Sequence, residues 1–181
     1  MNCNTGIRCN TWLSESMLRF IRERGFVTFT HAEGMVNVAE KPITRRIAVA
    51  VGNIEVPKRI CDAIFDASKV INSKGDVCGV ARVAGIHAAK RTSSIIPLCH
   101  QIPLNQVHID INRVGPNLLE IVATADASAR TGVEMEALTA VSVSALTIYD
   151  MTKSALKGTL DKIIIKEIQL RSKIGGSNSS S

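Results

Sequence analysis

Two neighbouring segments of this 181-residue chain alternate apolar and polar residues, and this alternation constrains the fold more than any other feature. It runs through residues 104–114 and returns in residues 118–127. A period of two places the apolar residues of a strand on one face. Gly115-Pro116-Asn117 between the segments is typical of a turn, so we expect an antiparallel hairpin with one apolar face.

Periodic apolar residues predict further elements on both sides of the hairpin. Spacings of three and four predict helices, and shorter runs predict strands. The predicted helices cover residues 11–24, 57–72, 76–91 and 132–156, and the strands cover residues 45–51 and 163–172. The helix at 76–91 is rich in small residues, which we expect to pack closely against another backbone. Because strands and helices do not alternate strictly, the pattern predicts an α+β domain with helices on one face of a largely antiparallel sheet.

Composition narrows the classes of protein to which the chain can belong. Apolar residues make up 45% but aromatic residues only 3%, so we expect an aliphatic core and no stacking platform for single-stranded nucleic acid. The net charge is +6, yet residues 35–150 carry twelve basic and eleven acidic side chains, which argues against a nucleic-acid partner. No apolar run approaches about 18 residues, so no membrane span is expected.

The cysteines and the N-terminal segment indicate in which cellular compartment the protein is expected. Five cysteines, an odd number without a C-x-x-C pair, favour a reducing compartment over a disulfide framework or a zinc site. We expect no bound metal, because Cys99 and His100 are adjacent and no second pair of ligands lies nearby in the sequence. The expected location is the cytoplasm. Four arginines within residues 1–34 leave a mitochondrial transit segment as the alternative.

Three charged residues are candidates for chemistry. Lys74 lies in a glycine-flanked turn, and Asp150 and Lys153 are three residues apart on one predicted helix. Taken alone, they form a solvated turn lysine and an ordinary surface ion pair. Brought together around a phosphorylated substrate, they would bind phosphate and transfer protons, provided that burial or a neighbouring cation lowers a lysine pKa.

The opposite end of that predicted helix carries two glutamates. Thr131-x-x-Glu134 fits a capping box, which is the alternative to direct contact between Glu134 and a ligand. Met135 and Lys153 share a stripe but are 18 residues apart, about 27 Å along a straight helix. If both ends serve one small ligand, a second subunit must complete each site.

Two long segments of the chain resemble a known family, in the same order. One runs from Lys74-Gly-Asp-Val to Pro97-Leu-Cys-His100, and the other from Thr131-Gly-Val-Glu-Met-Glu to Tyr149-Asp-Met-Thr-Lys153. They look like the signatures of the MoaC family, the cyclic pyranopterin monophosphate synthases of molybdenum-cofactor biosynthesis. Weaker similarity extends from Met35 to about Gly176. We therefore expect an N-terminal extension of unknown role at 1–34, a synthase-like domain at 35–174 and a flexible Gly/Ser tail at 175–181.

The resemblance implies an architecture and a reaction. It implies a ferredoxin-like subunit in a dimer-based homohexamer, with the active site at a subunit boundary. The implied enzyme is a lyase that converts 3′,8-cyclo-7,8-dihydroguanosine 5′-triphosphate, the product of a preceding radical enzyme, to cyclic pyranopterin monophosphate and pyrophosphate. The implied chemistry is proton transfer and phosphate cyclisation, without a cofactor.

The resemblance also assigns roles to individual positions. It makes Lys74 and Lys153 the acid/base lysines, with Asp150 orienting or activating them. Arg46 and Lys173 would hold the triphosphate. The remaining substrate-binding positions that it implies are Leu98, Cys99, His100, Glu134, Met135 and Glu136.

The chain departs from the family pattern at three places. Asn37 replaces a usual aspartate, Ser128-Ala-Arg130 replaces a usual Thr-Gly-Lys, and the chain ends in serines where a basic segment is usual. None of these changes touches the lysines or the aspartate, so we expect an active enzyme with altered substrate affinity. A catalytically silent scaffold for the same pathway and a general RNA- or nucleotide-binding module are the competing hypotheses.

Overall fold

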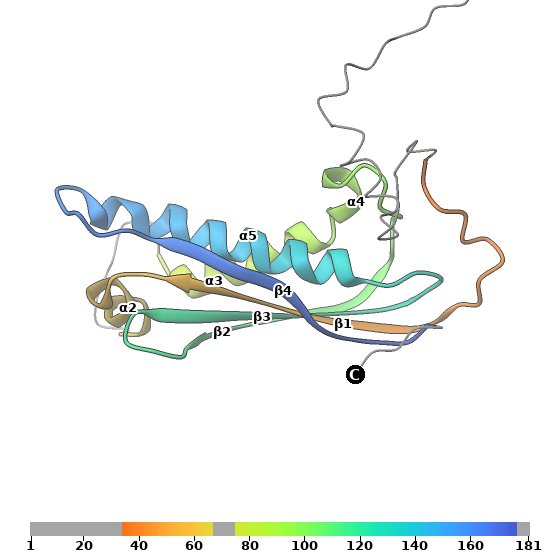
Figure 1. Cartoon of the computed structure of the whole chain (residues 1–181), viewed down its shortest axis with the longest axis horizontal. Helices are drawn as coiled ribbons and strands as arrows, with labels where there is room; N and C mark the ends of the chain where they lie inside the picture. Colours follow the sequence, from red (N-terminus) through yellow and green to blue (C-terminus); the bar gives the residue numbers. More distant parts are fainter. Residues whose placement is uncertain (1–33, 67–74, 177–181) are drawn as a thin grey trace, which may run out of the picture. The chain divides into compact units, whose positions relative to one another are not determined.

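Four antiparallel strands form one sheet in the order β2-β3-β1-β4 (Figure 1). The computed structural model describes residues 34–66 and 75–176, and Met35 begins a compact unit that contains all of the elements. The strands are β1 (Thr44–Glu55), β2 (Leu104–Arg113), β3 (Leu118–Ala129) and β4 (Ile164–Ile174). The predicted hairpin is confirmed as β2 and β3, which pair from Leu104 to Arg113 around the Gly115–Asn117 turn.

The two long helices cover one face of this sheet. They are α3 (Val77–Ala89) and α5 (Glu134–Thr152), and they lie side by side (Figure 1). The short elements are α2 (Lys58–Phe65), α4 (Thr92–Ile95) and the 3₁₀ turn η1 (Lys153–Leu156). The order β-α-β-β-α-β with these pairings is the ferredoxin-like arrangement, so the expected α+β fold is confirmed.

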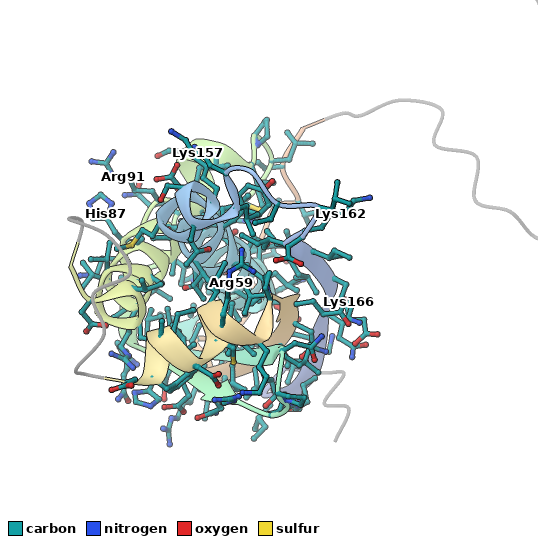
Figure 2. The ribbon with its side chains drawn as sticks, turned by 90° about the vertical axis from the view of Figure 1, so that its left-hand side faces the viewer. Arg59, His87, Arg91, Lys157, Lys162 and Lys166 are labelled. Atoms are coloured by element: carbon teal, nitrogen blue, oxygen red, sulfur yellow. The ribbon has the colours of Figure 1, made fainter. Side chains whose placement is uncertain are left out.

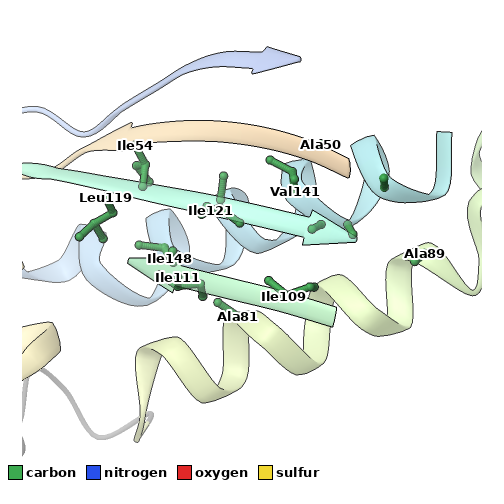
Figure 3. Packing of buried hydrophobic residues seen from close by; sticks show 14 of the residues in the cluster. Ala50, Ile54, Ala81, Ala89, Ile109, Ile111, Leu119, Ile121, Val141 and Ile148 are labelled. Atoms are coloured by element: carbon green, nitrogen blue, oxygen red, sulfur yellow. The ribbon is translucent and has the colours of Figure 1, made fainter. Parts of the chain in front are cut away.

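The core is aliphatic, as the composition predicts. Isoleucine, leucine and valine side chains from the sheet meet α3 and α5, and many small alanines line the inner face of β1 and β3 (Figure 3). The two aromatic residues in the described parts of the chain, Phe65 and Tyr149, are 44% and 40% exposed. Hydrophobic packing of the helix layer therefore depends on close approach rather than on large rings.

Gly85 of α3 lies against α5 with no room for a side chain. A Cβ on Gly85 would overlap the Ser144 hydroxyl and would lie 2.8 Å from the Ala140 carbonyl oxygen. The Ser144 hydroxyl in turn donates a 3.0 Å hydrogen bond to the Ala81 carbonyl. The close packing expected for this small-residue helix is confirmed.

Three predicted helices differ from the structure or lie outside it. The helix predicted over 57–72 is observed as α2, which ends at Phe65 before the extended backbone of Asp66, and residues 67–72 of the prediction lie outside the described residues. The helix predicted over 132–156 begins at Glu134 and continues after Thr152 as the 3₁₀ turn. The helix predicted over 11–24 and the proposed transit segment lie outside the described residues.

Strand β4 is longer than predicted and is irregular. Its pairing with β1 shifts register twice, between Val49 and Ala50 and between Val51 and Asn53, and Glu167 in this stretch has a φ of 56°. Each shift interrupts the alternation of side chains along β4. As a result Lys173 pairs with Ala48 and points to the helix side of the sheet.

Candidate functional site

A cavity of about 310 Å³ lies at the end of the molecule where α5 begins. Three segments distant in the sequence form its walls: residues 36–41 before β1, residues 98–102 after α4, and residues 131–136 at the start of α5. Six of the eight predicted substrate-binding residues line it, namely Leu98, Cys99, His100, Glu134, Met135 and Glu136. The fold thus brings the two signature segments together, and the binding roles of these residues remain predictions.

Burial raises the pKa of two side chains in the cavity wall. Glu136 is only 3% exposed, and burial, followed by the nearby charge of Glu134, raises the pKa of its carboxyl. Burial and the charge of Glu136 also raise the pKa of the Cys99 thiol. A raised thiol pKa is the opposite of what an activated nucleophile needs, so Cys99 is suited to lining the cavity rather than to covalent chemistry.

Glu134 connects the cavity to β4. Its Oε1 lies 3.4 Å from Nζ of Lys173, the residue that the β4 irregularities turn toward the helices. The N-cap of α5 is Val133 and makes no side-chain cap hydrogen bond, so the capping-box interpretation of Thr131 and Glu134 is wrong. The Glu134 side chain folds back over Gly132 instead, where a Cβ would collide with its carboxylate.

Arg46 lies on the same face of the sheet as Lys173 but does not line the cavity. Its guanidinium packs against Gly175 and Gly176 just after β4, and its buried Nε has no hydrogen-bond partner within the described residues. Burying an unpaired donor costs free energy, so this N–H would be stabilised by donating a hydrogen bond to an anionic partner. Lys173 thus places one cation beside Glu134, and Arg46 places another at the end of β4, and neither residue lines the cavity.

The segment from Val36 to Lys41 forms the outer wall of the cavity. His100 Nε2 lies 2.8 Å from the Val36 carbonyl oxygen, and the Asn37 side-chain oxygen accepts a 2.9 Å hydrogen bond from the Ala39 N–H. A carboxylate oxygen could accept the same bond, so the change from aspartate to Asn37 preserves this contact. Lys41, which also lines the cavity, was missed by the sequence analysis, because a lone lysine between two predicted elements carries no signal of its own.

Asp150 and Lys153 lie at the other end of α5. The Lys153 Nζ is 2.7 Å from Asp150 Oδ1, and both side chains are about half exposed. Hydrogen bonding to Asp150 and the charge of its carboxylate raise the pKa of Lys153. Further bases, Lys157 and Lys162, extend outward from the loop at this end (Figure 2). Lys74, the second predicted acid/base lysine, lies outside the described residues.

An unbroken helix separates the two groups of predicted site residues. α5 has 19 residues, about 28 Å at 1.5 Å per residue, with the cavity at its first turn and the Asp150–Lys153 pair in and after its last. One copy of α5 cannot bring both groups to one small molecule. In the described parts of the chain, no cluster of three or more possible metal-ligating side chains occurs, and no helix is long and apolar enough to cross a membrane.

Known proteins resemble this chain over most of its length. The sequence profile of the MoaC family matches residues 35–176, most of the chain. The chain belongs to the MoaC family. Its similarity to individual MoaC family members extends over most of both sequences in each case.

Three of these relatives carry names that state the same activity. A cyclic pyranopterin monophosphate synthase of Desulforapulum autotrophicum is 49% identical over 154 residues, which cover 82% of this chain and 90% of the relative. Cyclic pyranopterin monophosphate synthase 1 of Mycobacterium tuberculosis is 46% identical over 160 residues, 88% of this chain and 86% of the relative. The enzyme of that name from Staphylococcus epidermidis is 49% identical over 146 residues, 78% and 86% of the two chains.

Proposed function

We propose that this protein is a cyclic pyranopterin monophosphate synthase, a lyase of molybdenum-cofactor biosynthesis. The observation that carries the proposal is the cavity between Leu98–His100 and Glu134–Glu136, which joins the two family signatures in one chain that is 46–49% identical to synthases of that name. Its substrate would be 3′,8-cyclo-7,8-dihydroguanosine 5′-triphosphate, and its products cyclic pyranopterin monophosphate and pyrophosphate.

The charges around the cavity suit each part of this substrate. The Glu134 and Glu136 carboxyl groups can hydrogen-bond the N–H groups of the guanine-derived ring, and the raised pKa of Glu136 favours a form that can also donate a proton. The Arg46 and Lys173 side chains, with Lys41, supply positive charge for the phosphates. Neutralising the phosphates stabilises the charge that develops on departing pyrophosphate.

The phosphate step needs proton transfer but no redox partner. The ribose 2′-hydroxyl attacks the α-phosphorus, the bond from that phosphorus to the bridging oxygen breaks, and pyrophosphate leaves with the bonding pair. A general base takes the hydroxyl proton, and an acid can return one to the product. Lys153 is held as an ammonium ion by Asp150 in the free subunit, which suits it to the acid role. Lys74 is the proposed partner lysine for opening and reclosing the ring.

We further propose that each active site is shared by two subunits. The length of α5 supports this, because Lys153 can reach a cavity only if that cavity belongs to another copy. A dimer-based homohexamer would supply such a boundary repeatedly. Burial of Lys153 at the boundary between two subunits would also remove it from water, which lowers a lysine pKa and makes proton transfer near neutral pH possible.

A turnover assay tests the proposed function. The cyclic triphosphate, produced by the preceding radical enzyme, is mixed with the purified protein, and the pterin product and pyrophosphate are measured separately. We expect one pyrophosphate for each pterin formed. Tight binding of the intermediate without turnover would instead support the scaffold hypothesis, and binding of mixed-sequence RNA at physiological salt would support the third.

A further inference from the structure

One arginine outside the cavity contacts the segment that forms its outer wall. Residues 35–41, which we call the arm, have no helix or strand of their own, and most of them are exposed. A single turn, closed by the Lys41 N–H on the Val38 carbonyl at 3.1 Å, gives the arm its local shape. A turn this short cannot fix its own position over a cavity, so contacts from other segments must do so.

Two side chains from distant segments make such contacts. His100 lines the cavity and contacts the Val36 carbonyl, whereas Arg130 does not line the cavity and donates to the Ala39 carbonyl. Arg130 directly follows β3 and precedes the turn into α5, so its backbone is part of the rigid frame of the fold. Its guanidinium NH1 donates to the Ala39 oxygen at the centre of the Val38–Lys41 turn.

The position of Ala39 makes this contact consequential for Lys41. Ala39 is bound from both sides, since its N–H donates to Asn37 and its carbonyl accepts from Arg130. Lys41 lies two residues further along and lines the cavity, and within the part of the chain that the structure describes no carboxylate pairs with its ammonium group. A cation held at the mouth of an anion-binding cavity gains affinity when it is fixed beforehand.

We infer that Arg130 is a positioning residue that holds the arm over the cavity and thereby presents Lys41 to the anionic part of the substrate. Arg130 itself does not line the cavity. The inference rests on the proposed function for the identity of the substrate, but the contact between Arg130 and the arm does not.

Amide hydrogen exchange measures whether Arg130 holds the arm in place. In Arg130→Ala we expect exchange of the Ala39 and Lys41 amides to rise about tenfold or more, because the turn can open without moving the rest of the fold. Arg171→Ala is the matched control, since it removes an exposed arginine that pairs with Glu120 by a 2.6 Å contact on the other face of the sheet. Arm exchange should be unchanged in the control. Unchanged exchange in Arg130→Ala as well would overturn the inference.

Kinetics then separate positioning from direct contact. Arg130→Ala should raise KM for the cyclic triphosphate about three- to tenfold with kcat within about twofold, and Arg130→Lys, which keeps the charge, should recover part of the loss. If Arg130 acts through Lys41, the variant carrying both Arg130→Ala and Lys41→Ala should be no worse than Lys41→Ala alone. Losses that multiply in the double variant would mean that Arg130 acts independently of Lys41 and would overturn the inference. An inactive wild-type protein would refute the proposed function, while the exchange measurement would still decide the role of Arg130.

Discussion

The Lys153 ammonium lies 2.7 Å from the Asp150 carboxylate, at the end of the helix whose first turn carries Glu134 and Glu136, and both side chains are about half exposed. An exposed i,i+3 pair contributes little to stability. Its position about 28 Å along α5 from the cavity also separates it from the other predicted site residues of the same subunit. This separation is the reason for proposing that the pair acts at the cavity of a neighbouring subunit.

Removing either lysine should abolish most of the turnover. We expect Lys153→Ala and Lys74→Ala each to lower kcat at least about a hundredfold, because an acid–base group contributes about 10²–10⁴ in rate. Asp150→Asn should lower kcat as well, because it removes the carboxylate that orients the Lys153 ammonium group. Circular dichroism and the assembled mass should stay as in the wild type. Near-normal kcat in either lysine variant would remove that lysine from the mechanism.

Mixing two inactive variants tests whether the site is shared. A Lys153→Ala subunit has an intact Glu134, and a Glu134→Ala subunit has an intact Lys153. If two subunits share each site, random mixing makes half of the dimers heterodimers, and each heterodimer has one complete site out of two. About a quarter of wild-type activity should therefore return. The variants are unfolded and refolded together, with each variant refolded alone as the control. If all residues of a site come from one chain, activity stays at the level of the separate variants.

Gly85 should be far less tolerant of a methyl group than Gly79 on the same helix. Gly85→Ala forces a Cβ into Ser144 and the Ala140 carbonyl of α5, and overpacking of this kind costs about 1–3 kcal/mol of unfolding free energy. At Gly79 a Cβ would meet only the flexible Asp76 side chain, so Gly79→Ala should be neutral or gain from helix propensity. Urea unfolding of both variants measures the difference. Equal stabilities would show that the two helices can separate freely.

Glu136 should make the fold less stable as the pH rises. Burial raises the pKa of its carboxyl, so above the ordinary glutamate range the unfolded chain releases a proton that the folded chain still holds. The contribution of Glu136 to the free energy of unfolding is therefore fully present at low pH and is lost as the pH rises through the raised pKa. Glu136→Gln should melt at a higher temperature than the wild type at pH 8, and the gain should shrink toward pH 4. A gain that grows toward pH 4 would contradict the predicted direction of the pKa shift.

Local sequence patterns were sufficient for most elements but not for their ends. The hairpin around Gly115–Asn117 and the small-residue helix α3 were predicted because each follows one dominant period. The end of α2 at Phe65 was not predicted, because it depends on which residues find a partner in the core. The capping box at Thr131 was also wrong, since the helix begins at Glu134 with Val133 as its N-cap and the Glu134 carboxylate lies near Lys173.

The sequence alone determined the fold class, the family and the two signature segments, because these depend on periodicity and on residue order along the chain. Only the tertiary structure decided which charges meet. Strict alternation along β4 would place Lys173 on the face opposite Leu170. The register shift between Val49 and Ala50 instead puts both on the helix side, where Lys173 lies 3.4 Å from Glu134. Ala39 and Val36, in the segment that carries Lys41, likewise contact Arg130 and His100, which lie 91 and 64 residues further along the chain. Contacts between distant segments depend on how the chain packs, and no local pattern encodes them.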